Sequence, residues 1–154
     1  METLIKRMMK FTERDLIVGL AAVIGGLVST IVVALPLEVF LGLHPTLAGI
    51  VEEPAKVIAL IIIALVLPEW LTSKSKCALF GGLAGLGFSF TENLWKYLGF
   101  LAVKGGITPE LIYGRTLLSL PFHIFVSAIA GMGLLYIAAK GKEGYKNALG
   151  LLFV

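Results

Sequence analysis

The sequence predicts an all-α protein, a polytopic membrane helix bundle of about four transmembrane helices plus a short connecting helix. Of its 154 residues, 58% are hydrophobic and only 15% are charged, whereas soluble domains carry about 25% charged residues. The mean hydropathy is +0.95. The apolar residues gather into runs of about 20, the length that a helix needs to cross the hydrocarbon core.

Four such runs define the predicted spans, which cover residues 16–37, 46–67, 77–103 and 120–139. Pro45 lies at the start of the second span, where proline suits the first turn of a helix. A short helix is expected over 109–119. Residues 146–154 are either a short interfacial tail or the start of a further helix. Residues 1–154 are therefore expected to form a single transmembrane domain.

The basic residues predict the orientation of the bundle. Four precede the first span, two lie between the second and third, and three follow the fourth. Because basic loops stay on the cytoplasmic side, we expect a multi-pass protein of the cell membrane with a cytoplasmic N-terminus. The net charge of +3 is small and its lysines adjoin apolar runs. We therefore expect membrane lipids as partners and no nucleic acid.

Several polar and charged residues lie inside the predicted spans, where each charge costs about 2.5–3.5 kcal/mol to insert and suggests function by default. They come from the second, third and fourth spans: Glu52, Glu53 and Lys56; Glu92 and Asn93; His123 and Ser127. Counted from the non-cytoplasmic ends, all three groups fall in the outer half of the bilayer. The sequence therefore predicts that they form one site.

The chemistry of these groups indicates activation of water. Glu52 or Glu53 is suited to act as general base, because a glutamate buried near other carboxylates gains proton affinity. Alternatively Glu53, Glu92 and His123 bind a divalent metal such as Zn²⁺, with an open position for water. The residue pattern leaves both schemes open.

Four further residues have supporting roles in this interpretation. Asn93 and Ser127 are placed to donate hydrogen bonds to a developing oxyanion. Lys56, three and four residues after the glutamate pair, lies on their helix face and is expected to hold them ionised and oriented. Arg115 precedes the fourth span, either as an interfacial anchor or as a partner of a site carboxylate.

Three segments, Glu52–Lys56, Phe88–Asn93 and His123–Ser127, resemble the ordered motifs of the PrsW-type intramembrane proteases. That family belongs to a wider group with the CAAX prenyl endopeptidases and the bacterial abortive-infection proteins. The resemblance covers residues 46–130. The prenyl endopeptidases have histidine in the second motif, so Glu92 fits the PrsW branch. The resemblance implies a membrane endopeptidase of the glutamate or metallo type that cleaves membrane-anchored protein or peptide substrates.

Two other functions fit the same residues. Acidic groups at one depth also suit a small transporter or a cation- or proton-binding membrane protein, and a catalytically inactive peptidase relative would keep the motifs. Transporters usually contain repeated halves with interrupted helices. The chain shows no internal repeat, which favours the peptidase.

Overall fold

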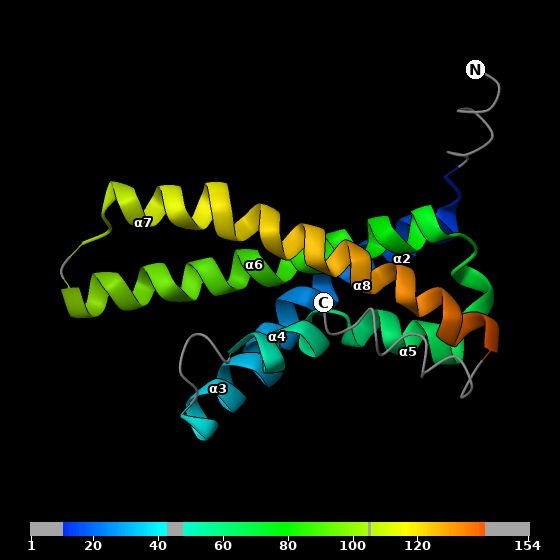
Figure 1. Cartoon of the computed structure of the whole chain (residues 1–154), viewed down its shortest axis with the longest axis horizontal. Helices are drawn as coiled ribbons and strands as arrows, with labels where there is room; N and C mark the ends of the chain where they lie inside the picture. The colour runs from blue at the N-terminus through cyan, green and yellow to red at the C-terminus, as the bar shows by residue number, and fades with distance from the viewer. Residues whose placement is uncertain (1–10, 43–47, 105, 141–154) are drawn as a thin grey trace, which may run out of the picture.

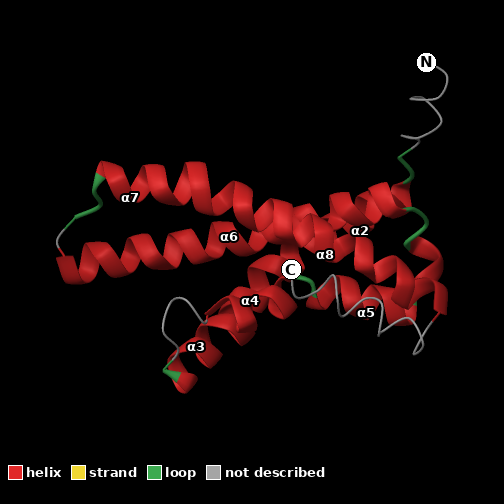
Figure 2. Ribbon diagram, in the orientation of Figure 1, coloured by secondary structure: helices red, strands yellow, loops and turns green. Residues whose placement is uncertain are grey.

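The computed structural model describes residues 11–42, 48–104 and 106–140, and these residues are helical almost throughout, with no strand among them (Figures 1 and 2). The predicted all-α class is confirmed. The possible further helix at 146–154 lies outside the described residues. The elements, in chain order, are α2 (Glu13–Ser29), η1 (Thr30–Ala34), α3 (Leu35–Leu41), α4 (Ala48–Lys56), α5 (Ile58–Val66), η2 (Pro68–Trp70), α6 (Lys74–Lys104), α7 (Pro109–Tyr113), η3 (Gly114–Ser119) and α8 (Leu120–Lys140).

The first helix begins at a capping box. Thr12 Oγ1 accepts a hydrogen bond from the Asp15 backbone N–H at 3.3 Å, and Asp15 Oδ2 accepts one from the Thr12 backbone N–H at 2.7 Å. Asp15 Oδ2 also lies 2.7 Å from Lys76 Nζ. The capped end of α2 is thereby tied to the start of α6. The helix runs through η1 into α3 and ends at Gly42, whose φ of 58° is a left-handed conformation that suits glycine.

Two π-helical turns interrupt otherwise regular helices. In η1 the Leu35 N–H bonds to the Thr30 carbonyl, and in η3 the Leu120 N–H bonds to the Arg115 carbonyl. A proline follows each of these leucines. Proline has no N–H, and its ring collides with the carbonyl four residues earlier in a regular helix, so a wider turn before it gives the ring room. The prolines thus allow the helices to continue.

The predicted second span is interrupted. It consists of α4 and α5, which are separated by Val57 with φ −108° and ψ 7°. Pro54 lies inside α4, and the hydrogen bond that it cannot donate weakens the helix where the interruption occurs. The interruption leaves Lys56 as the last residue of α4, next to the break.

The predicted short helix 109–119 and fourth span are instead one continuous helix through α7, η3 and α8. Glu13–Leu41 and Pro109–Ala139 are long and apolar enough to cross a membrane. Helix α6 has 31 residues, a sufficient length, but it carries several charges, and α4 and α5 are short. Within the described residues, two crossings therefore meet the criterion of length and composition, and the total of four remains a prediction.

Helix α6 packs between α2 and α8 through small residues (Figure 1). A Cβ atom at Gly81 would collide with the Ser127 carbonyl oxygen, and one at Gly85 would lie 2.5 Å from the His123 carbonyl oxygen. A Cβ at Gly26 of α2 would likewise collide with the Ala84 carbonyl. Glycine lets membrane helices approach this closely. The close approach sets the distance between the functional side chains of α6 and α8.

Candidate active site

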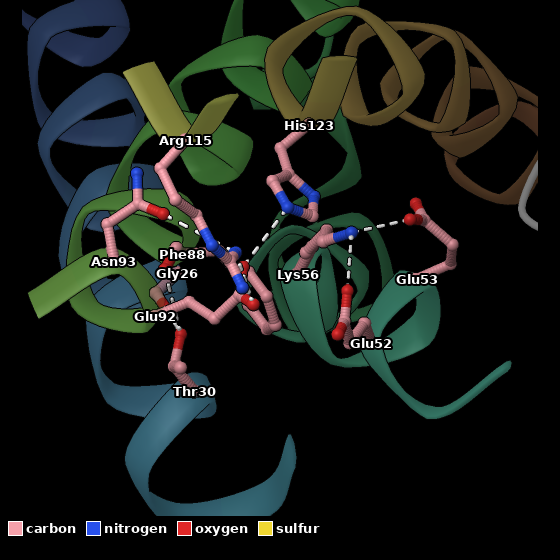
Figure 3. A network of polar contacts seen from close by, with 10 residues as sticks. All are labelled: Gly26, Thr30, Glu52, Glu53, Lys56, Phe88, Glu92, Asn93, Arg115 and His123. Carbon is pink, nitrogen blue, oxygen red and sulfur yellow. Dashed lines mark hydrogen bonds and ion pairs between the residues drawn. The ribbon is translucent and has the colours of Figure 1, made fainter. Parts of the chain in front are cut away.

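Three parts of the chain supply the polar cluster shown in Figure 3. Helix α4 contributes Glu52, Glu53 and Lys56, helix α6 contributes Glu92 and Asn93, and the η3–α8 helix contributes Arg115 and His123. The structure thus brings together the groups that the sequence predicts to converge. His123 connects the polar groups of α4 and α6, because it lies beside Glu92 and is grouped with Glu52 and Glu53.

Lys56 is fully buried and lies between the two glutamates of its own helix. Its Nζ is 2.5 Å from Glu53 Oε1 and 3.5 Å from Glu52 Oε2, and it lies 4.8 Å from the centroid of the Phe88 ring. A buried ammonium needs such compensation, which two carboxylates and an aromatic face provide. The expected partnership of Lys56 with the glutamate pair is present in the structure.

Glu92 accepts contacts from two side chains on the same neighbouring helix. Its Oε1 lies 2.8 Å from Arg115 Nη1, and its Oε2 lies 3.1 Å from His123 Nε2. The second contact has ion-pair distance but is not aligned as a hydrogen bond, since Glu92 Oε2 has no hydrogen-bond partner among the described residues. Such contacts in enzymes often align only with substrate bound. Arg115 Nη1 also reaches Asn93 Oδ1 at 3.5 Å.

His123 packs between aromatic rings while its second nitrogen stays free. Its ring centroid lies 5.8 Å from that of Phe88 and 6.4 Å from that of Phe122. His123 Nδ1 and Glu53 Oε2 are both buried, and neither has a hydrogen-bond partner among the described residues. In Figure 3 the free ring nitrogen points to the side where Lys56 and Glu53 lie.

The site has a donor set that suits a metal ion. Glu52, Glu53 and His123 each offer one ligand atom, and these three atoms lie within 4.8 Å of one another. Carboxylate oxygen and imidazole nitrogen are zinc ligands, and three protein ligands leave a fourth position for water. The buried, unpartnered atoms of Glu53 and His123 are the atoms that such an ion would satisfy. The residues therefore fit a metal.

The grouped donors in the structure differ in one member from the predicted ligand set of Glu53, Glu92 and His123. Glu52 is grouped with Glu53 and His123, whereas Glu92 contacts Arg115 and His123 Nε2. Spacing along one helix could not distinguish these arrangements.

The remaining predicted residues have different surroundings. Asn93 is 9% exposed and contacts Arg115 through its oxygen, which leaves its amide N–H groups to donate elsewhere. Ser127 is fully buried and its hydroxyl has no partner among the described residues. A Cβ at Gly85 would lie 2.7 Å from the Ser127 hydroxyl oxygen. Ser127 therefore lies in the contact between α6 and α8.

Two residues near the site were missed by sequence reasoning. Glu38, one residue beyond the predicted first span, is half-buried, with one carboxylate oxygen shielded from solvent. Thr30 is fully buried, and its hydroxyl bonds to the Gly26 carbonyl at 2.8 Å and approaches the Phe88 carbonyl at 3.4 Å. A threonine in an apolar run carries no signal for such a contact between helices.

Comparison with known proteins identifies the family. The family model for PrsW family intramembrane metalloproteases matches residues 14–154. No curated protein and no solved structure matches the chain. The family match covers the whole helical cluster that holds the glutamates and the histidine. The chain therefore belongs to the PrsW family of intramembrane metalloproteases, and it is a membrane peptidase that acts on protein substrates and uses a metal.

Proposed function

We propose that Glu52, Glu53 and His123 hold a zinc ion at which this peptidase hydrolyses membrane-anchored substrates. The observation that carries the proposal is the close grouping of their three ligand atoms within 4.8 Å. It is supported by the two buried atoms, Glu53 Oε2 and His123 Nδ1, that have no other partner among the described residues. An ion bound there would polarise the scissile carbonyl and lower the pKa of a bound water, so that the water loses a proton more easily and becomes a better nucleophile.

The side chains around that position have different proposed roles. In the alternative scheme without a metal, Glu52 or Glu53 instead accepts the proton that the attacking water gives up, and returns it to the leaving amine. Glu92 contacts His123 Nε2 and so keeps the opposite nitrogen, Nδ1, directed at the glutamate pair, as carboxylates commonly do for metal-binding histidines. Lys56 Nζ contacts one oxygen of each glutamate and so orients both carboxylates.

Asn93 and Ser127 differ in how well their surroundings suit the predicted role of hydrogen-bond donor to the oxyanion. The Asn93 amide group is available to donate to the oxyanion that develops on the substrate, because among the described residues only its oxygen is engaged. Ser127 lies against Gly85 between two helices. Its hydroxyl is buried in that contact and has no hydrogen-bond partner among the described residues.

The membrane setting determines which substrates reach the site. We infer that the N-terminus is cytoplasmic and that the site lies in the non-cytoplasmic half of the bilayer, as the distribution of basic residues predicts. Large apolar side chains remain exposed along α2, α6 and α8, Ile24, Leu94 and Phe125 among them. Such faces are solvated by lipid. A substrate anchored in the same membrane therefore shares the depth of the site.

The test is cleavage of a membrane-anchored peptide by protein purified and reconstituted in vesicles. Glu53→Gln and His123→Ala should each lower the rate by about 10²–10⁴-fold, the contribution typical of proton-transfer and related catalytic groups. Glu69→Gln is the matched control, because Glu69 is an exposed glutamate on η2. Variants at positions 53 and 123 that cleave as fast as the control would refute the assignment.

Metal analysis of the same preparations separates the metal site from a glutamate-only mechanism. The parent protein should contain about one zinc ion per chain after purification without chelator, and Glu53→Gln should contain less. An active protein free of metal would overturn the zinc assignment while leaving the peptidase intact.

A further inference from the structure

Arg115 is a cation whose main partner is a carboxylate on another helix. Its Nη1 donates to Glu92 Oε1 at 2.8 Å, and the Arg115 side chain is 22% exposed whereas that of Glu92 is 6% exposed. The other oxygen of the same carboxylate lies 3.1 Å from His123 Nε2. Arg115, Glu92 and His123 thus form a continuous chain of contacts across α6 and the η3–α8 helix (Figure 3).

The π-helical turn explains how one helix contacts the same carboxylate twice. Arg115 and His123 are eight residues apart, which in a regular helix of 3.6 residues per turn would separate them by about 80° around the axis. A π turn accommodates one additional residue, so the eight positions behave as about seven, or two full turns. The η3 turn, Gly114–Ser119, therefore places both side chains on one face.

We propose that Arg115 is a positioning residue that orients His123 for the metal by fixing Glu92. This inference rests on the proposed metal site. Arg115 makes no contact with Glu52 or Glu53 in the structure, and it acts on the ligand set only through the intervening carboxylate. With Glu92 Oε1 held by Arg115, Oε2 stays beside Nε2, and Nδ1 of His123 stays directed at the glutamate pair.

The proposal predicts that loss of Arg115 weakens metal binding, whereas electrostatics alone predicts that it strengthens metal binding. Removing a positive charge near a cation site should by itself strengthen the binding of a metal ion, because like charges repel. A positioning residue has the reverse effect, since loss of the groups that orient a metal-binding histidine typically weakens binding by about 10–100-fold. Metal affinity therefore distinguishes the two roles.

The experiment measures Zn²⁺ affinity of the full chain in detergent, by competition with a chromophoric chelator. Arg115→Ala should weaken Zn²⁺ binding by about 10–100-fold, and Arg115→Lys should restore part of the loss, because lysine keeps the charge but not the planar geometry. Arg14→Ala is the matched control, an exposed arginine at the start of α2. Leu118→Ala controls for changes in η3 and should bind as the parent does.

A double-mutant cycle tests whether the effect passes through Glu92. Glu92→Gln alone should weaken Zn²⁺ binding, and Arg115→Ala added to it should cause little further loss, because the two residues act in series. When Co²⁺ is bound in place of Zn²⁺, its d–d absorption bands report the ligand geometry independently of activity. Relative to the parent protein, these bands should change in Arg115→Ala and not in Arg14→Ala.

The outcomes separate this inference from the proposed function. Unchanged or tighter Zn²⁺ binding by Arg115→Ala, or equal further loss in the Glu92→Gln background, would overturn the role of Arg115 and leave the metal site standing. If Glu53→Gln binds Zn²⁺ as tightly as the parent, the metal site itself fails, and the inference fails with it.

Discussion

The contact between α6 and α8 at Gly85 gives a quantitative prediction for Gly85→Ala. A Cβ at this position would lie 2.5 Å from the His123 carbonyl oxygen, whereas ordinary contacts begin at 3.4 Å, so the helices must separate by about 0.9 Å. The atom encountered is backbone, which cannot rotate away. His123 is therefore displaced together with its helix.

The expected effects are on both activity and stability. Misplacing a catalytic group by about 1 Å can cost about 10²-fold in rate, and overpacking typically destabilises a protein by about 1–3 kcal/mol. The matched control is Gly82→Ala on the same helix, because a Cβ there has its nearest neighbour, Ile124 Cγ2, at 3.4 Å. Both variants gain the same helix propensity of alanine over glycine. Their difference therefore isolates the steric effect.

The assay compares peptide cleavage in vesicles and the thermal unfolding midpoint in detergent for the two variants. Gly85→Ala should cleave about 10²-fold more slowly than Gly82→Ala and unfold at a lower temperature. Equal rates for the two variants would show that the distance between α6 and α8 does not determine the position of His123, and the reasoning would be refuted.

Three further predictions follow from the site and its supports. Lys56→Met should destabilise the metal-free protein by about 3 kcal/mol or less, since it leaves two largely buried carboxylates, 12% and 14% exposed, without their cation. Added Zn²⁺ should reduce the loss, and an unchanged unfolding midpoint would contradict this. Chelation should abolish peptide cleavage and Zn²⁺ should restore it, and full activity of protein shown to be metal-free would contradict the zinc scheme. Asp15→Asn should lower stability by about 1–2 kcal/mol through the weakened helix cap and the lost contact with Lys76, with cleavage unchanged; a large loss of cleavage would indicate coupling between this end of the bundle and the site.

The fold class and the grouping of several polar side chains could be predicted because both depend on short-range regularities. Apolar runs of about 20 residues specify helices in a membrane. Spacings of three and four place Glu52, Glu53 and Lys56 together on one helix, and those contacts are present in the structure. Counting residues from the ends of the predicted spans then places the polar groups of different spans at a similar depth in the bilayer.

The finer features depend on packing between helices and could not be read from one helix at a time. The merging of the predicted short helix with the fourth span, and the π turn within it, follow from how the helix accommodates Pro121. The partners of Glu92 depend on that turn, because it rotates Arg115 toward α6. A proline inside a predicted helix marks where such a departure occurs, although it does not specify a kink, a break or a π turn.

The length of α6 has a consequence for the setting in which the enzyme works. At 1.5 Å per residue its 31 residues extend about 46 Å, whereas the hydrocarbon layer is about 30 Å thick. Even a tilt of 40°, the upper end of the usual range, leaves about 35 Å along the bilayer normal. If α6 crosses the membrane as the sequence predicts, its ends stand among the lipid headgroups. In that arrangement the depth of Glu92 changes with the tilt of α6, so bilayer thickness would determine how readily water reaches the polar cluster.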